Sequence, residues 1–164
     1  MADATFTHSP ATTDRGRLWV VLYLATTGLV LLLMMLAGLW MRLAQAGWVY
    51  TDPALFYQLM TVHGTGMVGI AALGGAAVLW HFLSAHVRLN AWVMGANFGL
   101  FLIGVVAILV ADFPGRFGGA WTFLYPLPAT SQGAWPVWAA ALHLGGLLVI
   151  GVGFLIWCLE LARG

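Results

Sequence analysis

The stretch that decides the fold is residues 56–85, which read FYQLMTVHGTGMVGIAALGGAAVLWHFLSA. It contains no Asp, Glu, Lys or Arg, and it is longer than the roughly 20 apolar residues that a helix needs to cross a bilayer. Backbone polar groups in lipid must be hydrogen-bonded within their own segment. We therefore predict that this stretch is a transmembrane helix.

Similar apolar stretches lie before and after it, so we predict transmembrane helices at residues 18–46, 56–85, 91–111 and 135–160. The composition agrees, because 62% of the 164 residues are hydrophobic and only 7% are charged, whereas about a quarter are charged in soluble domains. The predicted fold class is an all-α integral membrane protein. Residues 1–16 are predicted to be a polar cytoplasmic tail, and residues 17–164 the four-helix segment.

The arginines predict the orientation of these helices. Four of the six lie on one side of the predicted bundle: Arg15, Arg17, Arg88 and Arg163. Only Arg42 and Arg116 lie on the other side. Because positive charge collects on the cytoplasmic side, both termini are predicted to be cytoplasmic. The net charge of +1 gives no reason to expect a nucleic-acid partner.

His63 is the first candidate functional residue, because an imidazole at membrane depth usually has a partner. Gly64, Gly66 and Gly69 follow it, and they predict a flat face that a planar group such as heme could approach. The hydroxyl of Thr65 could hydrogen-bond the backbone or the imidazole. On residues alone, His63 is either a metal ligand or a helix-packing residue.

His143 and Arg42 are weaker candidates. His143 lies at a similar predicted depth, so the two histidines could form a bis-histidine heme site, although a helix–helix hydrogen bond is the favoured interpretation for His143. Arg42 needs a heme substituent or a lipid headgroup as partner.

The fourth stretch is rich in glycines that predict close helix packing: Gly145, Gly146, Gly151 and Gly153. Cys158 is the only cysteine, which excludes a cysteine-based metal site. No catalytic residue is predicted.

One pattern in the second predicted helix is specific. It is formed by Tyr57, Gln58, Leu59, Thr61, His63, Gly64, Thr65 and Met67. It resembles helix II of subunit I of the heme–copper oxidases, the cytochrome c oxidase superfamily. Weaker similarities lie in the order of that family, at residues 42–47, 88–90, 121–128 and 142–146.

The resemblance implies a fold and a site. The chain would be the N-terminal part, helices I–IV, of a twelve-helix subunit I. His63 would be an axial ligand of the low-spin heme, of type a or b, with Gly64, Thr65 and Gly66 beside it and Arg42 at the heme edge. His143 matches a family position that is not an axial ligand.

The resemblance also implies what this chain lacks. The second axial ligand, the high-spin heme ligand and the copper ligands lie on later helices of the family, so copper belongs only to the complete subunit. The expected partners are the remaining subunit I helices, subunit II, and cytochrome c or quinol as electron donor. The assembled enzyme, in a bacterial or archaeal cell membrane, would reduce dioxygen to water and translocate protons. A nitric oxide reductase, a small bis-histidine membrane cytochrome b and a heme-free packing subunit are the alternatives.

Overall fold

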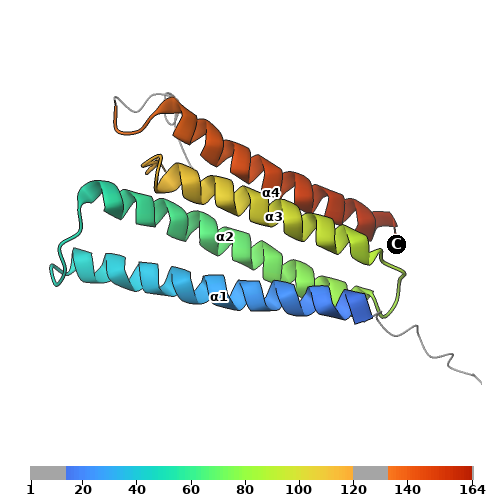
Figure 1. Cartoon of the computed structure of the whole chain (residues 1–164). Coiled ribbons are helices and arrows are strands. Elements are labelled where there is room, and N and C mark those ends of the chain that lie inside the picture. Colours follow the sequence, from blue (N-terminus) through green and yellow to red (C-terminus); the bar gives the residue numbers. More distant parts are fainter. Residues whose placement is uncertain (1–13, 120–132, 164) are drawn as a thin grey trace, which may run out of the picture.

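The computed structural model describes residues 14–119 and 133–163. These residues form the helices α1 (Asp14–Gln45), α2 (Pro53–Leu83), α3 (Ala91–Asp112) and α4 (Val137–Arg163), and no strand (Figure 1). Each helix is long and apolar enough to cross a membrane. The predicted fold class is therefore confirmed.

The first two helices begin earlier than the sequence predicts. α1 begins at Asp14 rather than at residue 18, so it includes the last part of the predicted tail. The rest of that tail, residues 1–13, lies outside the described residues. α2 begins at Pro53 rather than at residue 56, because Asp52 caps it: its carboxylate accepts a hydrogen bond from Leu55 N at 3.2 Å. Proline suits this first position, since it lacks the N–H that would be unpaired there.

The third helix agrees more closely, whereas the fourth begins and ends two or three residues late. α3 begins at Ala91 as predicted, and the side chain of Asn90 caps it by accepting from Trp92 N at 3.0 Å. α3 ends at Asp112 rather than at residue 111, which makes that aspartate part of the helix rather than of the link. α4 runs from Val137 to Arg163, against a prediction of 135–160.

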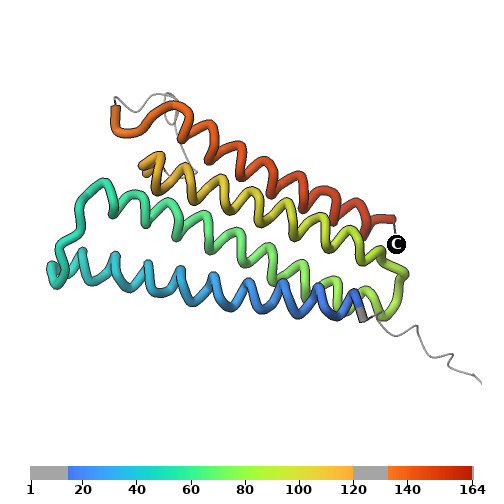
Figure 2. Tube along the Cα trace, viewed as in Figure 1, coloured from blue at the N-terminus to red at the C-terminus, as the bar shows by residue number. Residues whose placement is uncertain are grey.

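The helices form two antiparallel hairpins, α1 with α2 and α3 with α4 (Figures 1 and 2). The hairpins meet through weaker contacts of α3 with α1 and α2, whereas the backbone of α4 lies close to that of α3 alone. The main core lies in the half of the bundle nearer the 84–90 link and combines all four helices: Tyr23, Leu73, Ala76, Ala77, Trp80, Met94, Phe101 and Trp157. We call this end of the bundle the 84–90 end, and the opposite one the 46–52 end.

Two glycines allow α3 and α4 to approach closely. A Cβ added to Gly104 would lie 2.5 Å from the carbonyl oxygen of Gly146, and one added to Gly146 would lie 2.7 Å from that of Gly104. Small residues at such crossings let the backbones of membrane helices come together. The predicted close packing of the fourth helix is therefore present at Gly146.

A hydrogen bond joins the end of α4 to the start of α3 at the 84–90 end. Glu160, near the end of α4, accepts from the backbone N–H of Asn90 at 2.7 Å and from Arg163 at 2.9 Å. The Glu160 side chain is only 7% exposed. The end of α4 is thereby joined to the link that connects α2 with α3.

Candidate functional site

His63 lies ten residues after the start of α2, or about 15 Å along the helix at 1.5 Å per residue. It is half-buried and faces α1, where its Nδ1 lies 2.8 Å from the carbonyl oxygen of Met34. A carbonyl can only accept, so Nδ1 carries the proton and Nε2 keeps its lone pair. Within the described part of the chain, Nε2 has no hydrogen-bond partner.

This arrangement is the one in which a histidine binds a metal ion. A ligating imidazole commonly donates its second N–H to a backbone carbonyl or a carboxylate, which fixes the tautomer and the orientation of the ring. His63 therefore fits the part of an axial iron ligand, with Nε2 as the ligating atom.

Two glycines bring this imidazole against α1. A Cβ added to Gly38 of α1 would lie only 3.0 Å from Cε1 of His63. One turn further along α2, a Cβ added to Gly66 would lie 2.5 Å from the sulfur of Met34. The close fit of the two helices at this level therefore depends on one glycine from each.

The predicted flat glycine face is present only in part. Gly66 and Gly69 both line an apolar groove of about 280 Å³ to which all four helices contribute. Gly64 does not line it, because two residues along a helix turn the side chain by about 200°. The three glycines consequently do not share one side of α2, and the prediction is corrected to Gly66 and Gly69.

Thr65 and Arg42 lie close to this site in sequence and differ in what they contact. The hydroxyl of Thr65 donates to the carbonyl oxygen of Thr61 at 2.8 Å, so it bonds its own helix rather than the imidazole. Arg42 lies one turn beyond Gly38 on α1, is exposed, and donates to Gln45 Oε1 at 2.9 Å. Its contact with a heme edge stays a prediction.

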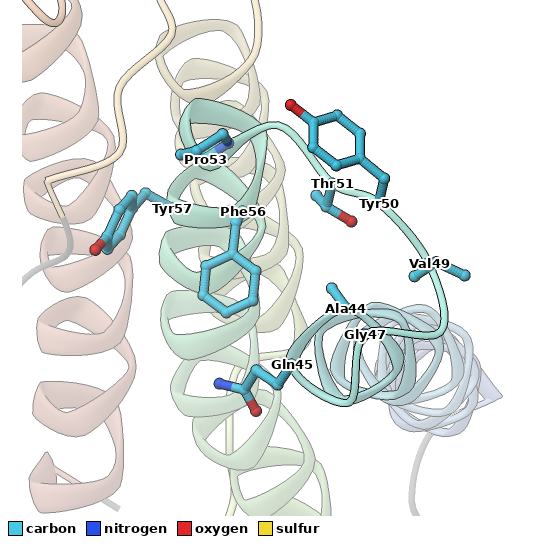
Figure 3. Close-up of a pocket in the computed structure, with 9 residues that line it drawn as sticks. All are labelled: Ala44, Gln45, Gly47, Val49, Tyr50, Thr51, Pro53, Phe56 and Tyr57. Atoms are coloured by element: carbon cyan, nitrogen blue, oxygen red, sulfur yellow. The ribbon is translucent and has the colours of Figure 1, made fainter.

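A second, larger cleft opens at the 46–52 end, where α1 turns into α2 (Figure 3). Its volume is about 490 Å³. Phe56 and Gln45 contribute from the two helices, and Tyr50 contributes from the link between them. The indole N–H of Trp40 donates to Thr51 at 3.0 Å and fastens this link to α1.

His143 contacts Asp112 of α3 rather than the site at His63. Its Nδ1 lies 2.7 Å from Oδ1 of Asp112, and neither side chain has any exposed surface. This is the helix–helix hydrogen bond that the sequence favours, and it joins α4 to α3. The structure does not bring His143 and His63 together, since His63 faces α1 and α4 packs along α3.

Asp112 is the residue that sequence reasoning missed. The predicted third helix ends at residue 111 and leaves Asp112 in the link, whereas it is the last residue of α3 and fully buried. The signal that could have revealed it is the buried histidine itself, because a buried imidazole needs a partner and Asp112 is the only acidic residue near that end of the neighbouring helix.

The chain matches the model of the family described as "Cytochrome C and Quinol oxidase polypeptide I" over residues 19–163. It belongs to this family. The match extends through all four helices of this oxidase polypeptide I chain and confirms the resemblance seen at the second helix. Searches among curated proteins and solved structures find no significant match.

Membership of this family indicates the general function of the chain. The chain is a multi-pass membrane protein of the heme–copper oxidase subunit I type, a family of oxidoreductases that work in multi-subunit oxidase complexes and typically bind heme. The match covers the N-terminal portion of such a subunit.

Proposed function

We propose that this chain supplies half of a low-spin heme site, with His63 as one axial ligand of the iron. The observation that carries the proposal is the hydrogen bond from Nδ1 of His63 to the carbonyl oxygen of Met34 at 2.8 Å. It holds the proton on Nδ1 and leaves the lone pair of Nε2 for a metal ion.

The chain's own residues orient and shield that ligand. The carbonyl of Met34 fixes the plane of the imidazole. Gly38 and Gly66 keep α1 close enough for this bond to form. The groove beside Gly66 and Gly69 offers an apolar surface on that side of α2. When bound, the heme iron supplies one-electron oxidation and reduction.

The remaining parts of the site would come from outside this chain. The second axial ligand, the high-spin heme ligand and the copper ligands would belong to the other helices of subunit I. In that assembly His63 would serve the transfer of electrons from cytochrome c or quinol toward a heme–copper centre that reduces dioxygen and translocates protons. The expected location is a bacterial or archaeal cell membrane, with both termini in the cytoplasm.

The bis-histidine cytochrome b is the less supported function. It requires two imidazoles on opposite sides of one iron, with their ligating nitrogens about 4 Å apart, given the usual metal–nitrogen distance of about 2 Å. The ring of His143 is instead held by Asp112.

Difference spectroscopy tests the proposal. The tagged chain is purified from its own membranes with its companion chains, and reduced-minus-oxidised spectra are recorded for wild type, His63→Ala and His143→Gln. His86→Ala is the matched control, since His86 is exposed at the 84–90 end. We expect His63→Ala alone to lose the low-spin heme signal. A signal that survives in His63→Ala would refute the proposal, and loss in both His63→Ala and His143→Gln would favour the cytochrome b.

A further inference from the structure

The buried pair formed by Asp112 and His143 is incompletely satisfied. Each side chain uses one atom in the 2.7 Å contact between them. Among the described residues, the second atom of each, Oδ2 of Asp112 and Nε2 of His143, is buried and has no hydrogen-bond partner. Leaving a buried polar atom unpaired costs about 1–3 kcal/mol, so these two atoms are favourable places for a further proton or hydrogen-bonding partner.

The pair lies at the 46–52 end of the bundle, close to the aqueous phase on that side. Asp112 ends α3, and His143 is six residues into α4. The chain after Asp112 folds back over the helix end, with Gly115 N donating to Val110 O at 3.0 Å and Phe117 N donating to Ala111 O at 3.1 Å. Arg116 adopts a left-handed conformation in this turn, with φ of 56°.

One aromatic layer covers the pair. The ring of Phe117 lies 4.6 Å from the ring of His143, centroid to centroid, and is itself fully buried. Trp135 packs on the edge of Phe117 at 5.1 Å. These two rings, together with Ala139 and Ala140, form a small apolar cluster. The cluster packs against the pair at this end of the bundle.

No other charge is buried with the pair. Asp112 is the only ionisable residue of α3, and the other titratable residues of α4 are Cys158, Glu160 and Arg163, at least four turns from His143. The turn contributes Arg116, which is exposed. α2 reaches the turn through Tyr57, whose Cβ would lie 3.0 Å from a Cβ added to Gly118. The charge state of the pair is therefore set mainly by how many protons it holds.

We infer that Asp112 and His143 form a proton-binding site that exchanges one proton with the aqueous phase at the 46–52 end. Before loading, Asp112 is a carboxylate and His143 is neutral, with its proton on Nδ1. The incoming proton binds to the free Nε2, and the Nδ1 proton is shared with Oδ1 of Asp112, so the loaded pair is neutral overall. Nε2 is the point of entry, and Phe117 is the lid that a proton-carrying water must pass. The site does not depend on heme, so it can be tested separately from the proposed function.

Histidine ring signals test this inference directly. The full chain is labelled with ¹⁵N-histidine and reconstituted in lipid nanodiscs, and the ring-nitrogen resonances are followed over the pH range in which the fold persists. His143→Gln assigns the resonance, and exposed His86 is the internal reference for an unburied ring. We expect the His143 ring to pass once between two protonation forms.

Two variants give the expected changes. Asp112→Asn removes the negative charge that holds the proton, and we expect it to weaken proton binding about tenfold or more. Phe117→Ala removes the lid, and we expect faster proton exchange at His143. A wild-type ring that stays in one form over the whole range would overturn the inference, whatever Phe117→Ala does. Unchanged proton affinity in Asp112→Asn would also overturn it, because the proton would then belong to His143 alone.

Discussion

At the scale of single residues, the sequence predicts His63 as the candidate ligand but not how the imidazole is held. The pattern around it lies within one helix and can be read directly. Met34 and Gly38 come from α1, and which of its residues face α2 depends on the rotation of one apolar helix against another. A helix that is hydrophobic all round carries little periodic signal of that rotation, so these contacts emerge only from the structure.

The contact between Gly38 and His63 gives a prediction at this scale. In Gly38→Leu the new side chain would occupy the place of Cε1, which a Cβ at this position already approaches to 3.0 Å. We expect the bond to Met34 to break and the heme content of the purified complex to fall about tenfold or more, as is common when a residue that orients a metal ligand is lost. Heme absorbance per mole of protein is the measurement.

Gly28→Leu is the control for this substitution. Gly28 lies on the same helix, and a Cβ added there meets nothing within 4 Å. Its heme content is expected to match wild type. Equal heme content in Gly38→Leu and Gly28→Leu would show that the imidazole does not need this contact.

At the scale of helices, the sequence predicts close packing from the glycines of α4 but not which of them take part. Gly146 and Gly153 face α3, where a Cβ would meet Gly104 and Asn97, whereas Gly145 and Gly151 have open space beside them. The number and length of the helices could be predicted because apolar length alone decides them. The faces through which the helices contact each other could not be predicted, because helices that are hydrophobic all round carry little periodic signal of their rotation.

Gly146 and its neighbour Gly145 form a matched pair for a prediction. Gly146→Leu forces a side chain against the carbonyl oxygen of Gly104, and such overpacking typically costs 1–3 kcal/mol. We expect the midpoint temperature of unfolding, followed by circular dichroism in nanodiscs, to fall clearly below that of wild type. Gly145→Leu points into open space and should leave the midpoint within the error of the measurement. If both variants unfold alike, the crossing at Gly104 is not a close contact.

At the scale of the whole molecule, the two hairpins depend on few connections. Short links make consecutive helices neighbours, so the pairing of α1 with α2 follows from the sequence. The bond between Glu160 and Asn90 does not follow, because these residues are 70 positions apart. In the sequence, Glu160 reads simply as a charged residue at a helix end.

Removing this bond should loosen the end of α4 from the start of α3. In Glu160→Ala the N–H of Asn90 loses its acceptor and can bond water instead, since Asn90 is exposed. We expect this to cost about 0.5–1.5 kcal/mol and to speed hydrogen–deuterium exchange of that amide. Glu160→Gln keeps an acceptor oxygen and should exchange more slowly than Glu160→Ala. Arg163→Ala is the control, because the Arg163 side chain is 68% exposed and does not bond Asn90. Unaltered exchange at Asn90 in Glu160→Ala would contradict the role of this bond.

The same bond also sets an order of events during synthesis. The acceptor for Asn90 lies in the last turn of α4, so the start of α3 has no such anchor while the ribosome is still making the residues in between. α1 and α2 can already pair in the membrane at that time. The bond between the end of α4 and the start of α3 forms only after Glu160 has left the translocon.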